Sequence, residues 1–192
     1  IRIKKEYKDI QEEDLQKINA LSEKLNHEGM HVIGVAAKRK NAGDTAVFHA
    51  EDETDMTFLG IIAFLDPPKP DAKEAIHGLY DAGVQVKVIS GDAPVVVEHV
   101  CKLVGMKVGE QNAVTGSDLE KMSEEELSRV VEKNDIFARL SPMQKQRVVD
   151  ALRKNRHVVG YMGDGVNDAP SLHDADVGIS VDNATDVAKA SA

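Results

Sequence analysis

The sequence predicts an α/β fold with a mostly parallel sheet from about residue 57 onward. Two observations support this fold class. Short apolar, β-rich runs alternate with stretches of helical period, which is typical of βαβ units. Two helix starts also carry capping-box signatures, at 123–126 (SEEE) and at 141–144 (SPMQ), the second with proline at the first helical position.

Residues 1–56 follow a different pattern. We expect a polar helix there, then a strand over 31–37 and a loop-like stretch over 38–55. The helix carries four apolar residues that should lie on its inner face: Leu15, Ile18, Leu21 and Leu25.

The α/β part begins with the strand expected at 57–65. Further strands are expected at 84–90, 136–138, 157–162 and 177–180. Apolar stripes at helical spacing indicate helices between them: Ala72, Ala75, Ile76, Leu79 and Tyr80 in one, and Val96, Val100, Leu103 and Val104 in another.

The stretch DPPKP at 66–70 is the best candidate for a domain boundary. Its prolines are stiff and cannot continue a strand. We therefore expect one segment over 1–65 and a second over 66–192.

Composition limits the classes of protein and partner. The 192 residues are 42% hydrophobic and carry 33 acidic against 24 basic side chains, a net charge of -9, without a basic run. Nucleic acid and anionic membrane surfaces are therefore not expected as partners. The single cysteine, Cys101, suits a reducing, cytosolic setting. The longest apolar stretch, 58–65, is far shorter than the roughly 20 residues that span a bilayer.

The turn GDGVNDAP at 163–170 has the chemistry of a magnesium site. Asp164 should emerge at the carboxyl end of a strand, where open α/β sheets bind ligands, and Asp168 follows four positions later. Like charges at that spacing repel, but a bound Mg²⁺ would reverse the sign, because Mg²⁺ prefers carboxylate, water and phosphate oxygens. The alternative is a capped turn whose aspartates face solvent.

Three other positions are candidate site residues together with this turn. Ser90 ends a strand, where its hydroxyl and the following N–H groups could hold a phosphoryl oxygen, although an N-cap is the alternative. Lys145 lies in the first turn of a helix, where its positive charge faces the positive end of the helix dipole. A bound anion would explain a cation at this position, and the alternative is a solvated lysine. Asp66 is a third strand-end carboxylate, or a hinge residue.

In chain order, the strand-end hydroxyl, the lysine and the acidic pair resemble the haloacid dehalogenase superfamily of phosphoryl-transfer enzymes. The strings DPP (66–68), SGD (90–92), FAR through SP to Lys145 (137–145) and GDGVNDAP (163–170) resemble the phosphorylation domain of P-type cation-transporting ATPases. This resemblance covers about residues 57–192 and implies a Rossmann-like haloacid dehalogenase fold. Residues 1–65 resemble the end of the nucleotide-binding domain with its return strand.

Site roles follow from the resemblance, position by position. It implies that Asp164 and Asp168 hold Mg²⁺, that Asn167 completes the network around the phosphorylated site, and that Lys145 neutralises the phosphoryl group. Such positioning and charge neutralisation do most of the work in phosphoryl transfer.

The resemblance also implies roles outside that turn. Ser90 stands where threonine is usual, followed by Gly91, and Asp92 would help to hold the nucleotide and the metal. The positions expected near ATP are Asp66, Lys69 and Arg139, with Lys69 standing where arginine is common. These departures, with FLDPPK (64–69) and GISVD (178–182), look most like the bacterial magnesium-transporting branch.

The family's phosphorylated aspartate lies in the string Asp-Lys-Thr-Gly-Thr, which does not occur in this sequence. Asp66 is a poor substitute, because Pro67 and Pro68 remove N–H groups that would cradle a phosphate. We therefore expect a cytosolic fragment of an integral membrane transporter. Its sheet should lack the strand between those that end at Ser90 and Asp164, and the fragment itself should form no phosphoenzyme.

The partners implied for such a fragment are ATP, the transported cation and the rest of the transporter, with its actuator domain, transmembrane helices and nucleophile strand. Two other functions stay open. One is a stand-alone Mg²⁺-dependent phosphatase of the same superfamily, and the other is a non-catalytic module that binds Mg²⁺ or nucleotide.

Overall fold

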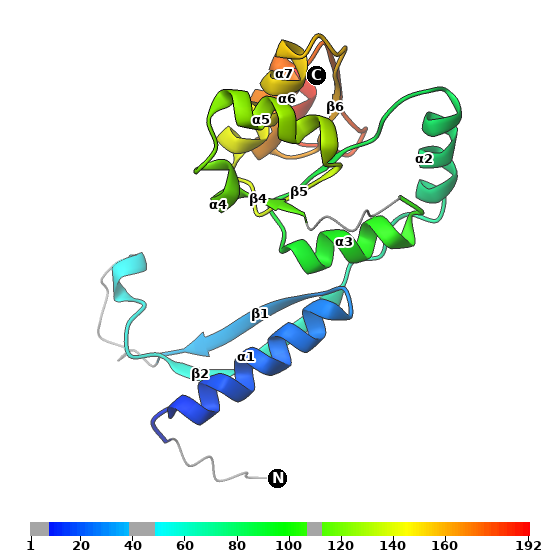
Figure 1. The fold of residues 1–192 in the computed structure, drawn as a ribbon. Coiled ribbons are helices and arrows are strands. Elements are labelled where there is room, and N and C mark those ends of the chain that lie inside the picture. The colour runs from blue at the N-terminus through cyan, green and yellow to red at the C-terminus, as the bar shows by residue number, and fades with distance from the viewer. Residues whose placement is uncertain (1–7, 39–48, 107–112) are drawn as a thin grey trace. The chain divides into compact units, whose positions relative to one another are not determined.

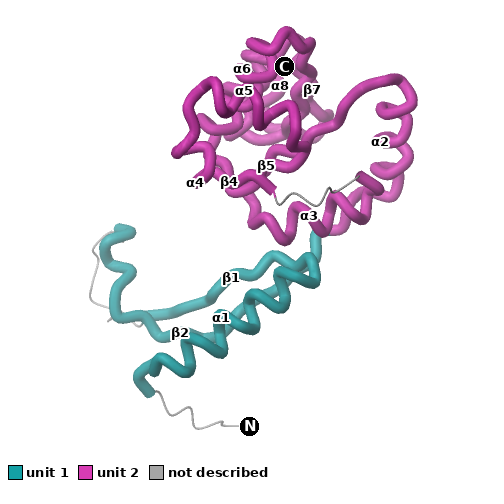
Figure 2. The backbone as a smooth tube through the Cα atoms, viewed as in Figure 1, with its two compact units in different colours: residues 1–66 teal, residues 67–192 magenta. Residues whose placement is uncertain are grey.

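The structure is a computed structural model that describes residues 8–38, 49–106 and 113–192. The chain divides into two compact units, residues 1–66 and 67–192 (Figure 2). The division falls within the proline-rich stretch 66–70. Among the described residues no helix is long and apolar enough to cross a membrane.

The described residues of unit 1 form one helix, a two-stranded sheet and a short 3₁₀ turn (Figure 1). Helix α1 (Glu12–His27) is followed by β1 (Met30–Ala37), η1 (Ala50–Asp52) and β2 (Thr57–Leu65). The strands pair antiparallel, with a bulge between Val35 and Ala36. Both predicted strands are confirmed. Most of the predicted 38–55 loop, residues 39–48, lies outside the described residues.

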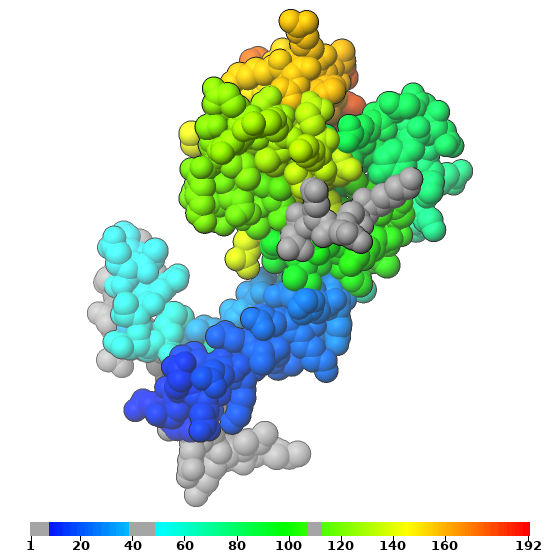
Figure 3. All heavy atoms as spheres, in the orientation of Figure 1, coloured from blue at the N-terminus to red at the C-terminus, as the bar shows by residue number. Residues whose placement is uncertain are grey.

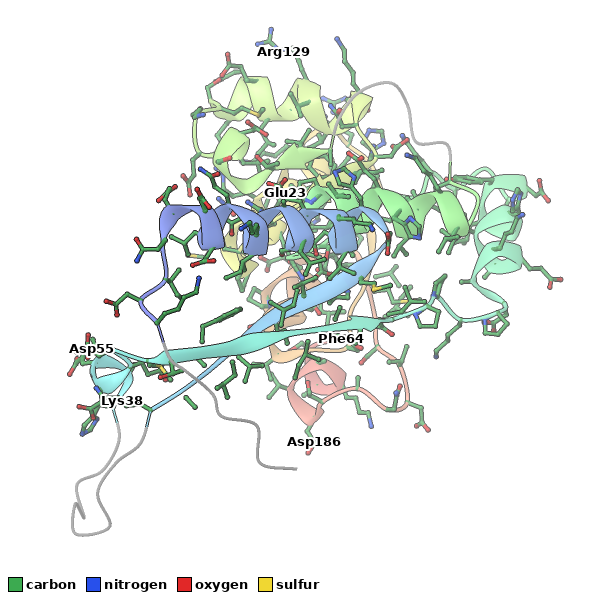
Figure 4. The ribbon with its side chains drawn as sticks, turned by 90° about the horizontal axis from the view of Figure 1, so that it is seen from below. Glu23, Lys38, Asp55, Phe64, Arg129 and Asp186 are labelled. Carbon is green, nitrogen blue, oxygen red and sulfur yellow. The ribbon has the colours of Figure 1, made fainter. Side chains whose placement is uncertain are left out.

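The prediction of an inner face on α1 is wrong for Leu15 and Leu21, whereas Ile18 and Leu25 are half-buried. No residue of α1 is buried, and Leu15 and Leu21 are 43% and 47% exposed. The sheet also leaves Ile33, Ile62 and Phe64 exposed, with Phe64 stacked on His31 at 5.4 Å between ring centroids (Figure 4). The physical reason is size: one helix and two strands cannot enclose a core of their own.

Unit 2 contains the predicted parallel strands. Strands β3 (Val88–Ile89), β5 (Ile136–Ala138) and β4 (Val114–Thr115) form one parallel sheet in the order β3-β5-β4. Strands β6 (Gly160–Met162) and β7 (Val177–Ile179) form a second parallel pair.

The helices of unit 2 lie around these strands (Figure 1). Their bounds, with the short 3₁₀ turn η2, are α2 (Ala72–Asp81), α3 (Pro94–Leu103), α4 (Gly116–Leu119), α5 (Glu124–Lys133), α6 (Pro142–Lys154), η2 (Val166–Asp168), α7 (Ala169–Asp174) and α8 (Asp186–Ser191). Both predicted capping boxes are present, at Ser123 and Ser141.

Several strands are shorter than the sequence predicts. The expected strand at 84–90 is reduced to Val88–Ile89, and the one at 157–162 to Gly160–Met162. The cause is the partner strand: β3 pairs with β5 and β6 pairs with β7, and each of these partners has only three residues to provide backbone groups for pairing. Strand β4 and helices α4 and α8 were not predicted, because so few residues give no clear periodicity.

The core of unit 2 consists of three clusters of buried side chains, and Phe137 of β5 is fully buried in the first. Ile89 and Val159 pack against both the first and the third cluster, so the two sheets share apolar contacts. The space-filling view shows the atoms of α5 and neighbouring segments covering one face of this unit (Figure 3).

Among the described residues the parallel strands of unit 2 form two separate sheets. Strand β3 is an edge of the three-stranded sheet, whereas β6 belongs to the other sheet. Ser90 follows β3 and Asp164 lies two residues after β6, so the two strands for which the sequence predicts a missing neighbour belong to different sheets.

Candidate functional site

Helix α6 brings Lys145 to the site. The Ser141 hydroxyl accepts the Gln144 N–H at 3.3 Å, and the Gln144 side chain accepts the Ser141 N–H at 2.9 Å. This reciprocal cap fixes the start of the helix, with Pro142 at its first position. Lys145 therefore lies on a firmly capped first turn.

The turn after β6 brings Asp168 to the same place. Its tight course depends on Gly163, because a Cβ at that position would lie 2.5 Å from Cβ of Asp168. No side chain fits at that distance, so glycine allows the Asp168 side chain to pack over the turn. The motif string alone does not indicate this close approach.

Lys145 and Asp168 form an ion pair with 2.8 Å between Nζ and Oδ1. Their side chains are 13% and 14% exposed. The same oxygen accepts the hydroxyl of Tyr161 at 3.0 Å, and Oδ2 accepts the N–H of Gly165 at 3.3 Å. The anion that accounts for Lys145 in this structure is therefore Asp168, and the solvated-lysine alternative is wrong.

Electrostatics keep this carboxylate charged. Burial raises the pKa of Asp168, but the Lys145 ammonium, with Tyr161 and the Gly165 N–H, outweighs burial and holds that pKa below its usual value. Burial and the adjacent carboxylate raise the pKa of Tyr161. Tyr161 thus stays protonated at neutral pH and is the donor.

The Ser90 loop forms a second group of contacts. The Ser90 hydroxyl donates to Oδ2 of Asp92 at 2.9 Å and accepts the Asp92 N–H at 3.0 Å. The N-cap alternative for Ser90 is wrong, because α3 begins at Pro94 and its N-cap is Ala93. Gly91 and Asp92 are exposed.

Arg139 joins the Ser90 loop to β5. The Arg139 N–H donates to the Asp92 carbonyl at 2.9 Å, and the Leu140 N–H donates to the Ser90 carbonyl at 3.0 Å. Arg139 has φ of +53°, in the left-handed region that side chains rarely adopt. The structure thus brings Ser90, Asp92 and Arg139 together through the backbone.

The remaining predicted residues are exposed. Asp66 is the last residue of unit 1, and the Lys69 carbonyl accepts the Ala72 N–H at the start of α2. Asn167 is exposed in η2. Their predicted roles at ATP and at the phosphorylated site stay predictions.

Asp164 fits a magnesium ligand by its position and chemistry. It is exposed after β6, and its side chain forms no hydrogen bond or ion pair with the described residues. Mg²⁺ is commonly held by one or two carboxylates with water and phosphate, so Asp164 needs no larger acidic cluster. Among the described residues no group of three His, Cys, Asp or Glu could hold a metal by itself. Asp168 already accepts three donors, and its predicted ligation of Mg²⁺ stays a prediction.

Tyr161 is the site residue that sequence reasoning missed. It lies in β6 between two exposed neighbours, Gly160 and Met162, and is itself only 7% exposed. Strand alternation could have indicated an inward phenol beside the acidic turn.

Cys101 is buried, and burial and Glu98 raise the pKa of its thiol to about 11. His173 is an exposed residue of α7. Glu124–Glu126 form the acidic first turn of α5, and Glu124 pairs with Arg147.

Comparison with known proteins identifies the protein family to which the chain belongs. Residues 2–176 match the family model of haloacid dehalogenase-like hydrolases. The chain belongs to this family.

The curated relatives narrow the comparison. The chain is 49% identical over 90% of its length to the "Magnesium-transporting ATPase, P-type 1" of Salmonella typhimurium and covers 19% of that protein. It is 45% identical over 93% of its length to the protein of that name from Escherichia coli, covering 20% of it. It is 36% identical over 97% of its length to a calcium-transporting ATPase of Listeria monocytogenes, covering 21% of it. The chain thus spans about a fifth of the length of these relatives, and the first two are named as P-type ATPases.

Proposed function

We propose that this chain is a cytosolic part of a P-type ATPase that couples cation transport to ATP hydrolysis through an aspartyl-phosphate. The names of its relatives indicate Mg²⁺ as the cation. The magnesium-transporting relatives support this proposal by their identity over nine tenths of the chain. Residues 66–192 would be the phosphorylation domain, and residues 1–65 would end the nucleotide-binding domain.

The observation that carries the proposal is the division of the described parallel strands into two sheets, with β3 at the edge of one and β6 in the other. Ser90 follows β3, and the turn that carries Asp168 follows β6. Ile89 in β3 and Val159 next to β6 pack against the same two clusters, so a strand between β3 and β6 would border both groups. A strand inserted there would end beside these groups, at the carboxyl ends of the parallel strands, where such sheets bind ligands. We infer that the rest of the transporter supplies this strand with its aspartate.

The residues would then act by charge and position. Mg²⁺, held at Asp164, would neutralise negative charge on the phosphoryl oxygens. The Lys145 ammonium and the Ser90 hydroxyl would contact those oxygens, and Gly91 would let the backbone approach them. Asn167 and Asp168 would maintain the turn that carries Asp164.

Nucleotide contacts would come from the other predicted positions. Asp92, Arg139, Asp66 and Lys69 would lie toward ATP, with Asp92 and Arg139 linked as the structure has them. The actuator domain and the transmembrane helices of the parent would complete the cycle.

The test is phosphoenzyme formation from ATP labelled at the γ-phosphate. The intact parent transporter should form an acid-stable acyl-phosphate, and Asp164→Asn should reduce it by at least about a hundredfold, since removal of a charge-stabilising group costs that much in related sites. Asp186→Asn, an exposed aspartate of α8, is the matched control and should change nothing.

The 192-residue chain alone should form no phosphoenzyme. Sustained Mg²⁺-dependent hydrolysis of a chromogenic phosphate ester by this chain, lost in Asp66→Ala, would instead support a stand-alone phosphatase. Mg²⁺ or nucleotide binding without any phosphoenzyme in the parent would support a non-catalytic module.

A further inference from the structure

Tyr161 connects the core of unit 2 to the ion pair. Its ring packs in the cluster that contains Val149 and Leu172, and its hydroxyl donates to Oδ1 of Asp168 at 3.0 Å. Because the core holds the ring, the position of the hydroxyl is fixed.

Asp168 has one cationic partner and two neutral donors among the described residues. The cation is Lys145, at 2.8 Å from the oxygen that Tyr161 also contacts. The second neutral donor, the Gly165 N–H, lies 3.3 Å from Oδ2. Of the two neutral hydrogen bonds to Asp168, the one from the Tyr161 hydroxyl is therefore the shorter.

The proposed function requires Lys145 to contact a phosphoryl oxygen. An ammonium that turns toward phosphate weakens its pairing with Asp168, whose side chain is only 14% exposed. A mostly buried carboxylate without its cation is strongly unfavourable. A donor that stays in place lowers this penalty, because it continues to satisfy the charged oxygen.

We propose that Tyr161 is a positioning residue for phosphoryl transfer: its hydroxyl holds Asp168 while Lys145 exchanges that carboxylate for a phosphoryl oxygen. The exchange rests on the proposed function, whereas the contact between Tyr161 and Asp168 does not. The two parts therefore need separate experiments.

The first experiment is a double-mutant cycle on the unfolding of the purified chain at pH 8. Tyr161→Phe should lower the ratio of folded to unfolded protein about fivefold, the size of one modest hydrogen bond. In the Lys145→Met background the same change should cost about thirtyfold, because Asp168 then loses its last side-chain donor. Equal costs in the two backgrounds would overturn the proposal, since loss of packing alone is additive.

Tyr80→Phe is the matched control. Tyr80 lies on α2, edge-on to His77, and its hydroxyl forms no hydrogen bond with the described residues. Its cost should be the same with and without Lys145.

A second background covers the case that Lys145→Met does not fold. In Asp168→Asn the acceptor has no charge, so the cost of Tyr161→Phe should fall to about twofold. A cost that stays at fivefold there would overturn the proposal.

The second experiment measures phosphoenzyme formation by the intact transporter. Tyr161→Phe should slow the rate constant about tenfold and leave the half-saturating ATP concentration unchanged, because only the step after binding needs the exchange. An unchanged rate constant would overturn the positioning role. A wild-type transporter that forms no phosphoenzyme would overturn the proposed function. The double-mutant cycle on unfolding would still test the contact between Tyr161 and Asp168.

Discussion

The two units differ in how they hold their apolar side chains. In unit 2 the described residues form three buried clusters, in which Phe137, Leu119 and Leu127 are fully buried. In unit 1 the described leucines, isoleucines and phenylalanines all keep part of their surface exposed. Regular helix and strand patterns alone therefore do not make a stable unit, because stability comes from burial.

The largest expected effect is in the core of unit 2. Phe137→Ala should cost about 3–5 kcal/mol of unfolding free energy, since it removes a fully buried aromatic ring. Leu21→Ala in α1 should change it by less than about 0.5 kcal/mol, because Leu21 is largely exposed. Urea unfolding followed by circular dichroism measures both. Similar costs would mean that unit 1 has a core of its own.

A second effect is expected at the ion pair. Lys145→Met should cost about 3 kcal/mol, because it leaves the mostly buried Asp168 carboxylate without its cation. The exposed pair Lys8–Asp14 of unit 1 gives the contrast, and Lys8→Met should have no measurable effect. The same urea experiment detects either result. If Lys145→Met left the unfolding free energy unchanged, the ion pair would be solvated.

Acid should act mainly on unit 2. Side-chain hydrogen bonds lower the pKa of Asp118 and Glu124, and the Lys145 pair lowers that of Asp168 against the opposing effect of burial. A lowered folded-state pKa gives stability that is present above the unfolded value, near pH 4, and is lost as the pH falls through the folded value. The urea midpoint should therefore be constant from pH 7 to 5 and fall below pH 4. A midpoint that rises in acid would contradict the directions of these pKa changes.

The smallest expected effect is at helix caps. Ser141→Ala should cost about 1 kcal/mol, since α6 packs on the core and loses its N-cap acceptor. Asp14→Ala at the start of α1 removes an exposed contact with the Gln11 N–H and should cost less. Equal losses would show that α1 is as firmly packed as α6.

Much of the fold could be predicted from local patterns. Alternating runs and capping boxes located β2, β5, α5 and α6, because these signals depend on residues close in the chain. The lengths of β3 and β6, and the short β4, could not be predicted, since a strand extends only as far as its partner pairs with it. The exposure of Leu15 and Leu21 in α1 could not be predicted, because an apolar stripe does not indicate which element packs against it.

The sequence by itself determined which chemical groups the site could contain. Ser90, Lys145, Asp164 and Asp168 each follow a strand or begin a helix, and their types follow from the motif strings. Only the tertiary structure decided how they are paired: it placed Lys145 on Asp168 rather than in solvent, and it added Tyr161 from the core. The reason is that partners 23 and 7 residues apart meet only after the core of unit 2 has packed β6 against α6.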